Sequence, residues 1–101
     1  YVGESDHFKG KPVHEAVVEA ALESGLAGAT VLRGILGYGA HQRIHSSRIL
    51  RLSGELPLVI QIVDREDKLR AFLPRLDEML TEGMASIEPA EVIFYRSSRD
   101  R

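Results

Sequence analysis

Residues 24–39 read SGLAGATVLRGILGYG, and the predicted fold class follows from them and their neighbours. Ala29-Thr30-Val31-Leu32 is a short, partly β-branched run that is typical of a strand. The run continues into a glycine-rich turn from Gly34 to Gly39. Glycine can adopt a positive φ and lets the backbone approach another group closely. These residues therefore predict a strand that ends in a sharp turn.

A helix is predicted on the N-terminal side of this strand. Its apolar residues recur at offsets of 0, 3, 4, 7 and 8, which places them on one helical face. They are Val13, Ala16, Val17, Ala20 and Ala21. Pro12 is predicted to open the helix and Gly25 to close it.

A second helix with the same periodicity is predicted on the C-terminal side. Its apolar residues are Leu69, Phe72, Leu73, Leu76, Met79 and Leu80. Asp64 is predicted to cap this helix and Gly83 to end it, while Glu66 and Arg70 are spaced as an i,i+4 ion pair. Pro74 lies inside the helix, where it removes one backbone hydrogen bond, so a kink or even a split is expected there.

Two more strands are predicted, from Leu58 to Val63 and from Glu91 to Tyr95. Tyr1-Val2 reads as the tail of another strand, so a few N-terminal residues of a longer protein are expected to be missing. The resulting order is strand, helix, strand, strand, helix, strand. It predicts an α+β fold in one domain over residues 1–101: a ferredoxin-like βαββαβ sandwich with an antiparallel sheet and two helices on one face.

The predicted strands are apolar on both faces, although two helices can cover only one face. Val31 alternates with Leu32, and Ile60 alternates with Val59. A solvated face would alternate with polar residues, so the second face is expected to pack against another subunit. The alternative is that a long loop or further N-terminal residues cover it. The prediction is a homo-oligomer.

Composition places the chain among ordinary globular proteins. It has 44% hydrophobic and 28% charged residues in 101 positions, enough for one modest core. No run approaches the ~18 apolar residues that a membrane span needs, so direct membrane insertion is not expected. There are no cysteines, which fits a reducing compartment. A cytoplasmic location is the expectation.

Charge is distributed unevenly along the chain. Residues 24–54 contain four arginines and no acidic residue, so this stretch carries +4 while the rest of the chain carries −6, giving the net −2. Its basic and titratable side chains are those of Arg33, His41, Arg43, His45, Arg48 and Arg51. A local positive field indicates an anionic partner.

Four motifs carry a resemblance to a known family. They are Ala27-Gly28-Ala29-Thr30-Val31, Arg33-Gly34, Gly37-Tyr38-Gly39 and Arg43-Ile44-His45-Ser46-Ser47. In these motifs the chain resembles a family of small uncharacterised proteins related to the PII signal-transduction proteins. The resemblance implies a ferredoxin-like trimer whose clefts between subunits bind adenine nucleotides, with AMP, ADP or ATP as the expected ligand. It also implies that the loop over residues 37–54 contacts a target protein.

The charge and the resemblance together give one candidate ligand-binding site. Its residues are Gly37, Tyr38, Gly39, His41, Arg43, His45, Arg48 and Arg33. The glycines could turn backbone N–H groups toward a phosphate, or only permit a bulge. The arginines could bind phosphate through their planar donors, or only be solvated. Tyr38 could stack on a base or fill a subunit contact.

Arg33 and the two histidines have further alternatives. Arg33 lies in an apolar strand and needs a partner, for which an acidic residue across a subunit interface is favoured over a ligand anion. His41 and His45 are four residues apart, but the loop offers no carboxylate to complete a metal site, so no metal is predicted. Titration near neutral pH is the favoured use of these histidines.

Enzyme and nucleic-acid functions are not favoured. Ser46 and Ser47 follow His45 directly, but no acidic residue in the loop could orient a catalytic base. Glu4 and Asp6 make the turn after the first strand acidic, which disfavours an acylphosphatase-like phosphate site. The few aromatic residues, three Tyr and three Phe, avoid the two central strands, which disfavours RNA.

The favoured function is that of a non-catalytic protein that senses an adenine nucleotide or a similar phosphorylated metabolite at its subunit interfaces. The alternative is a structural or adaptor oligomer whose basic loop binds an acidic protein surface without a small ligand.

Overall fold

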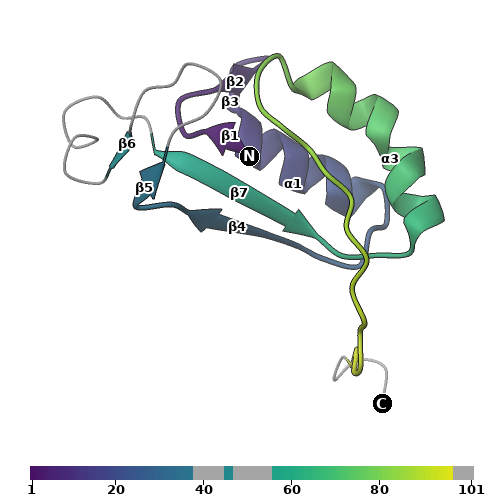
Figure 1. Ribbon diagram of the computed structural model, residues 1–101. Helices are drawn as coiled ribbons and strands as arrows, with labels where there is room; N and C mark the ends of the chain where they lie inside the picture. The colour runs from purple at the N-terminus through teal and green to yellow at the C-terminus, as the bar shows by residue number, and fades with distance from the viewer. Residues whose placement is uncertain (38–44, 47–55, 97–101) are drawn as a thin grey trace.

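The computed structural model describes residues 1–37, 45–46 and 56–96 of the chain (Figure 1). The elements along the chain are β1 (Val2–Gly3), β2 (His7–Phe8), β3 (Lys11–Pro12), α1 (Val13–Glu23), β4 (Ala29–Arg33), β5 (Leu36–Gly37), β6 (His45–Ser46), β7 (Pro57–Ile62) and α3 (Glu66–Met79). Figure 1 shows α1 and α3 on the same side of the main sheet. The fold is therefore α+β, with antiparallel sheets and two helices, as predicted.

The main sheet has the strand order β1-β7-β4. β7 is antiparallel to both neighbours, with Val2 opposite Leu58 and Val31 opposite Ile60. β1 and β4 are therefore parallel to each other, are joined through α1, and have β7 inserted between them. This is a split βαβ unit, which is compatible with a ferredoxin-like fold.

The core lies between α1 and the main sheet. All five residues of the predicted α1 face are buried, and Val17 is 1% exposed. Burying a valine side chain to this extent contributes about 1.5–3 kcal/mol. Gly25 ends the helix with a φ of 74°, and the Leu26 N–H donates to the Ala21 carbonyl over 3.1 Å. The predicted face and end of α1 are confirmed.

α3 confirms part of its prediction and corrects the rest. The helix runs without a break through Pro74, so the expected split is wrong. The Glu66–Arg70 ion pair forms over 3.6 Å. Asp64 does not cap the helix, because its Oδ2 accepts a hydrogen bond from the Ala27 N–H over 2.9 Å, and so it anchors the loop between α1 and β4.

Gly83 serves a different purpose from the predicted one. α3 already ends at Met79, and Gly83 lies further on with a φ of 121°, where the chain crosses Tyr1. A Cβ added to Gly83 would lie 2.4 Å from the Tyr1 carbonyl oxygen. Glycine is required here because the backbone of the N-terminal residue passes so close.

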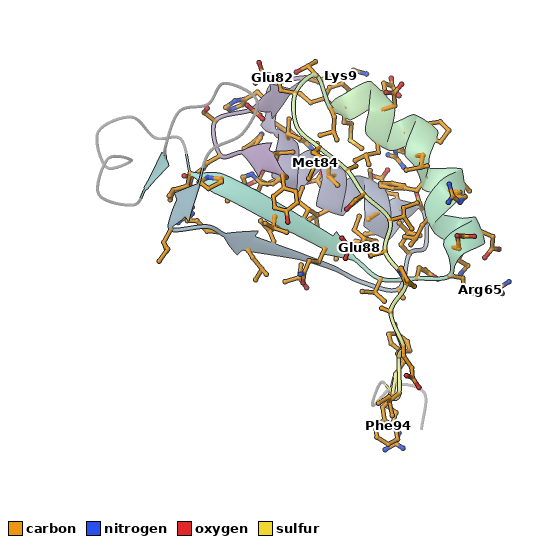
Figure 2. The ribbon with its side chains drawn as sticks, viewed as in Figure 1. Lys9, Arg65, Glu82, Met84, Glu88 and Phe94 are labelled. Atoms are coloured by element: carbon orange, nitrogen blue, oxygen red, sulfur yellow. The ribbon has the colours of Figure 1, made fainter. Side chains whose placement is uncertain are left out.

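The strand predicted from Glu91 to Tyr95 does not form. Val92, Ile93, Phe94 and Tyr95 are each at least 55% exposed, and the segment projects from the body of the molecule (Figure 1). Figure 2 places Phe94 far along this projection, whereas Met84 lies near β1. The prediction is wrong because a strand needs a neighbouring backbone, and none of the described residues pairs with this segment as a strand.

Two short hairpins were not predicted. β2 and β3 pair through a two-residue turn at Lys9 and Gly10, whose φ angles are 50° and 80°. Positive φ at both central positions is typical of a type I′ turn, for which a residue followed by glycine is the sequence signal. β5 and β6 form the second hairpin, which lies beyond the C-terminal end of β4 and the N-terminal end of β7.

Candidate functional site

The described residues include three of the eight predicted ligand-binding positions. Arg33 is the last residue of β4, Gly37 is the last residue of β5, and His45 is the first residue of β6. These elements lie at one end of the main sheet (Figure 1). The predictions for Tyr38, Gly39, His41, Arg43 and Arg48 lie outside the described residues.

Gly37 and His45 are brought together by the β5–β6 hairpin. They are directly opposite each other in an antiparallel pair, next to the pair of Leu36 and Ser46. Opposed residues in such a pair have Cα atoms about 4.5–5.5 Å apart. The backbone positions of Gly37 and His45 are therefore close enough to contribute to one site.

Arg33 is paired within its own chain. Its guanidinium donates to a Glu4 carboxylate oxygen, and their side chains are 60% and 26% exposed, respectively. Arg33 has its acidic partner within its own chain, because β1 and β4 are parallel and end at the same end of the sheet. Pairing across a subunit interface stays a prediction. A ligand anion would have to compete with Glu4 for this guanidinium.

The acidic turn after β1 is engaged by the protein itself. Asp6 accepts a hydrogen bond from the Gly3 N–H over 2.9 Å, and Glu4 binds Arg33. Sequence reasoning treated Glu4 only as a source of negative charge and missed it as the partner of Arg33. The signal that could have identified it is position, since Glu4 follows β1 and Arg33 ends the parallel strand β4.

The face of the sheet that points away from the helices is partly apolar. Leu32 is 48% exposed and lies opposite Val59, whereas Thr30 lies opposite Gln61. Ile35, just beyond β4, is 76% exposed. Thr30 and Gln61 thus form a polar middle of this face, with Leu32 and Ile35 toward the β5–β6 hairpin and Val63, which is 51% exposed, beyond the other end of β7. The predicted apolar second face is therefore confirmed in part, because Thr30 and Gln61 interrupt it.

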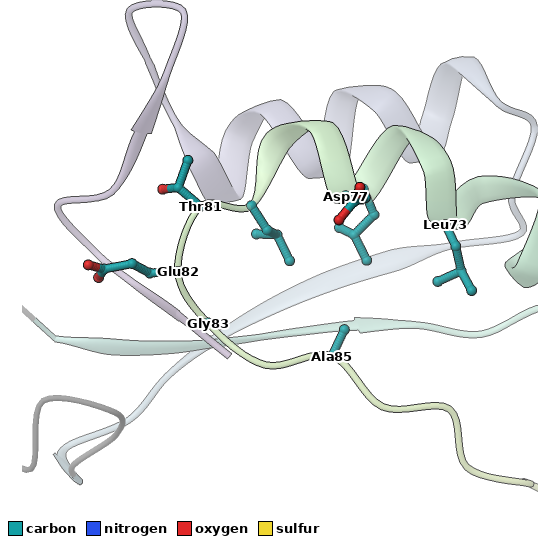
Figure 3. Close-up of a pocket in the computed structure, with 8 residues that line it drawn as sticks. Leu73, Asp77, Thr81, Glu82, Gly83 and Ala85 are labelled. Atoms are coloured by element: carbon teal, nitrogen blue, oxygen red, sulfur yellow. The ribbon is translucent and has the colours of Figure 1, made fainter.

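Two hollows among the described residues lie away from this end of the sheet. One, of about 350 Å³, lies beneath α3 and is lined by Leu73, Leu76 and Ala85 among others (Figure 3). The other, of about 320 Å³, lies between the β2–β3 hairpin and the two helices. Neither of these two hollows is lined by Arg33.

Two of the three cations that line the second hollow are paired with acidic residues. Lys11 binds Glu19, which raises the pKa of the Lys11 ammonium through a hydrogen bond and charge attraction. Arg75 binds Glu23 and lowers the pKa of that carboxyl group in the same way. Lys9, the third cation that lines this hollow, lies over the Phe8 ring, with its Nζ 5.2 Å from the ring centroid. Because two of its three cations are already neutralised, this hollow is a weaker candidate for an anion than the arginine-rich stretch.

The described part of the chain shows neither a metal-binding cluster nor a membrane-spanning helix. Within residues 1–37, 45–46 and 56–96, no three histidine or acidic side chains are grouped as a metal would require. Neither helix in the described part of the chain is long and apolar enough to cross a membrane.

Comparison with known proteins gives one family. Residues 1–92 match the family DUF190, described as "Uncharacterized ACR, COG1993". A UPF0166 protein of Aquifex aeolicus is 37% identical over 94 residues, which cover 93% of this chain and 89% of the relative. A UPF0166 protein of Methanocaldococcus jannaschii is 36% identical over 80 residues, which cover 79% of this chain and 73% of the relative. A second Aquifex aeolicus UPF0166 protein is 37% identical over 78 residues, which cover 77% of this chain and 81% of the relative.

Proposed function

The chain belongs to the DUF190 family, and from this premise we propose that it is a non-catalytic, PII-like regulatory protein of the cytoplasm. The proposed ligand is an adenine nucleotide or a similar phosphorylated metabolite, bound where subunits of a homotrimer meet. The proposed target is another protein, contacted through residues 37–54. The split βαβ topology supports the PII-like part of this proposal by analogy of fold.

One observation carries the proposal. Arg33, the first arginine of the acid-free stretch, ends β4 next to the apolar patch formed by Leu32, Val59 and Ile35. An exposed apolar patch favours contact with another protein surface. Cations beside such a contact would face the boundary between two copies, where a phosphate could be held away from bulk water.

The residues of the stretch would have distinct roles. Arg43 and Arg48 would bind phosphate oxygens through paired guanidinium N–H groups, which hold such anions more strongly than neutral donors do. Gly37 and Gly39 would allow backbone N–H groups to approach the same anion, and Tyr38 would stack on the base. His45, opposite Gly37, would add positive charge as the pH falls toward its titration range.

The adaptor alternative has its own supporting observation. The described hollows do not reach Arg33, and Arg33 is already paired with Glu4. A basic stretch beside a flat apolar patch would also suit an acidic protein surface. The two proposals differ in whether a small phosphorylated molecule binds.

Isothermal titration calorimetry with AMP, ADP and ATP tests the proposal. Saturable heat is expected for at least one nucleotide. Arg43→Ala is expected to weaken binding about 10- to 150-fold, the equivalent of about 1.5–3 kcal/mol for a hydrogen bond to a charged group. The matched control is Arg70→Ala, which removes an arginine from α3 that binds Glu66. Blank titrations with all three nucleotides would favour the adaptor.

Light scattering tests the assembly separately. A mass of three subunits is expected at micromolar concentration, and Leu32→Lys is expected to shift the population toward smaller species because it places a charge in the apolar patch. Thr30→Lys, on the polar part of the same face, is the matched control. A wild-type protein that stays monomeric would exclude a site between subunits.

A further inference from the structure

β4 is an edge strand whose outer side has no partner strand among the described residues. The main sheet has the order β1-β7-β4, so β4 has a neighbour on one side only. The Gly34 N–H donates to the Pro57 carbonyl of β7 over 2.8 Å. Because successive residues of a strand direct their backbone groups to opposite sides, Leu32 also faces β7, whereas Val31 and Arg33 face outward.

β4 itself carries few of the features that protect an edge strand from further pairing. It is five residues long, from Ala29 to Arg33, and contains neither proline nor lysine. Its single charge is on its last residue. Natural sheet edges are usually blocked by such residues, by bulges or by a covering segment, and an unblocked edge is a template for another strand. The outer edge of β4 is therefore suited to accept one.

The C-terminal arm (residues 91–95) has the composition of a strand and projects from the same molecule. Its residues Val92, Ile93, Phe94 and Tyr95 are 55%, 76%, 70% and 69% exposed. β-Branched and aromatic residues are favoured in strands because they pack well on the side chains of neighbouring strands. Four adjacent exposed apolar side chains on a projecting segment (Figure 1) indicate a surface that another protein covers.

The arm does not run along its own β4. The Tyr95 hydroxyl donates to the Ala27 carbonyl over 3.1 Å, which places the arm beside the loop that enters β4. The arm extends away from the body at this end of the sheet, instead of back along β4 toward Arg33 (Figure 1), and Phe94 lies far along the projection (Figure 2). An acceptor strand for the arm must therefore come from another molecule.

We propose that the arm of one copy pairs, as an antiparallel strand, with the outer edge of β4 in a second copy. The arm and β4 have the same length of five residues. The register places Glu91 opposite Arg33 and Tyr95 opposite Ala29. The contact joins two different surfaces, so a closed homotrimer contains three such contacts. This exchange of arms goes beyond the proposed function, because it needs no phosphorylated ligand.

The distribution of charge favours this register. Opposite charges directly across an antiparallel pair stabilise it, as Glu91 and Arg33 would. The Arg33 side chain is 60% exposed and its guanidinium has five N–H donors, so it can bind Glu91 in addition to Glu4. A parallel arm would instead place Glu91 beside Ala29, at the end of β4 that has no cation.

The apolar side chains of the arm also match their neighbours in this register. Val92 would lie opposite Leu32, on the face of the sheet away from the helices, and would extend the apolar patch around Leu32. Ile93 would lie opposite Val31, whose side chain packs against the core. The arm would thus continue the surface proposed above as a subunit contact, which favours a second copy of this chain over an unrelated protein.

Disulfide cross-linking between copies tests the proposal, because the chain has no cysteine of its own. Leu32→Cys and Val92→Cys are made as separate variants, and only the second is isotope-labelled. The two are unfolded and refolded together so that copies mix. The proposed register places the two Cα atoms about 4.5 Å apart, which suits a disulfide. Mass spectrometry after mild oxidation measures the disulfide that joins a labelled to an unlabelled chain.

The matched control mixes Leu22→Cys with the same labelled Val92→Cys. Leu22 is 78% exposed on α1, so its cysteine reports random collisions between copies. The disulfide between Leu32→Cys and Val92→Cys is expected to form on the order of 10-fold or more faster than the control disulfide, because pairing raises the local concentration of the two thiols. Equal rates would overturn the proposal.

Hydrogen exchange followed by NMR gives a second readout, without cysteines. Ile93→Asp changes a side chain that is 76% exposed, so the fold is expected to persist while the charge prevents pairing beside Val31. The Val31 and Arg33 amides are then expected to exchange on the order of 10-fold or more faster than in the wild type, whereas the Leu32 amide, which faces β7, is unchanged. Unchanged exchange at Val31 and Arg33 would contradict the proposal.

Light scattering separates this proposal from the homotrimer itself. A mass of three subunits without the preferred disulfide would support the homotrimer and overturn the exchange of arms. The preferred disulfide at a mass of two subunits would support the exchange of arms and overturn the homotrimer. A monomer at every concentration tested would overturn both.

Discussion

α1 and α3 have the same apolar periodicity but different surroundings. All five residues of the α1 face are buried, because α1 packs on β4 and β7. On α3, Phe72 and Met79 are buried, whereas Leu73 and Leu76 border the hollow and are half-buried. An amphipathic pattern thus predicts which face of a helix is apolar, but the burial of that face depends on the strand opposite it.

The largest expected effect contrasts the core beneath α1 with the hollow beside α3. Leu58→Ala removes a side chain that is 2% exposed at the centre of the main sheet, so it is expected to lower the free energy of unfolding by about 2–5 kcal/mol. Leu76→Ala, beside the hollow, is expected to cost less than half as much. Urea unfolding of both variants at equal protein concentration measures the two losses.

Leu22→Ala is the control for replacing a helical leucine by alanine without losing buried contacts. Leu22 lies on α1 but is 78% exposed, so its truncation is expected to change stability by less than about 0.5 kcal/mol. If Leu76→Ala proved as costly as Leu58→Ala, α3 would be packed as tightly as α1, and the contrast between the helices would be lost.

The second prediction concerns the place where the C-terminal segment meets β1. Gly83→Ala is expected to cost about 1–3 kcal/mol, because Gly83 has a φ of 121° and its new Cβ would lie 2.4 Å from the Tyr1 carbonyl. Gly28→Ala is the matched control, since a Cβ there has no neighbour within 4 Å. Thermal unfolding of the two variants measures the difference. Equal melting temperatures would mean that the crossing over Tyr1 is not tightly held.

The part of the molecule built from α1 and β7 was largely predictable from the sequence. The α1 face, its glycine end and the strand around Ile60 all follow from local spacing, and each is packed against a partner that the chain itself supplies. The strand predicted from Glu91 to Tyr95 failed for the opposite reason. Its β-branched composition describes a preference, but a strand also needs a neighbouring backbone, and composition does not say where that neighbour lies.

The candidate site was less predictable because its contacts join distant residues. Arg33 was correctly identified as a cation in need of a partner, but Glu4 is 29 positions away in sequence and becomes its neighbour only through the parallel course of β1 and β4. Asp64 was likewise the right residue type for a cap, yet its Oδ2 accepts from Ala27 instead. The roles of Tyr38 to Arg48 stay predictions from charge and resemblance.

The third prediction is a pH dependence centred on Asp64, which ties β7 to the loop before β4. Hydrogen bonds from the backbone N–H groups of Arg65 and Ala27 lower the pKa of its carboxyl group. A lowered folded-state pKa means that the stabilisation is present above the ordinary value of about 3.9 and is lost as the pH falls through the folded-state value. Asp64→Asn is therefore expected to flatten the fall in stability below about pH 4.

Asp77→Asn is the control for this acid dependence, since Asp77 is an exposed carboxylate on α3. Urea midpoints between pH 2.5 and 6 are compared for the wild type and both variants. If Asp64→Asn and the wild type lost stability in parallel over this range, the link between Asp64 and the loop would not contribute to acid sensitivity.

The smallest expected effect comes from the pair of Glu4 and Arg33, which lies at the candidate site and not in the core. Both side chains are partly exposed, so a double-mutant cycle with Glu4→Gln and Arg33→Gln is expected to give about 0.2–1 kcal/mol of coupling. The coupling should shrink as salt is added, because exposed charges are screened.

Nucleotide affinity separates the two roles of Arg33. If Arg33 also binds the proposed anion, Glu4→Gln should strengthen binding by removing a competing carboxylate, while Arg33→Gln should weaken it. If neither substitution changes an affinity that Arg43→Ala weakens, Arg33 only holds β4 to the turn after β1, and the ligand site lies entirely beyond the end of β4.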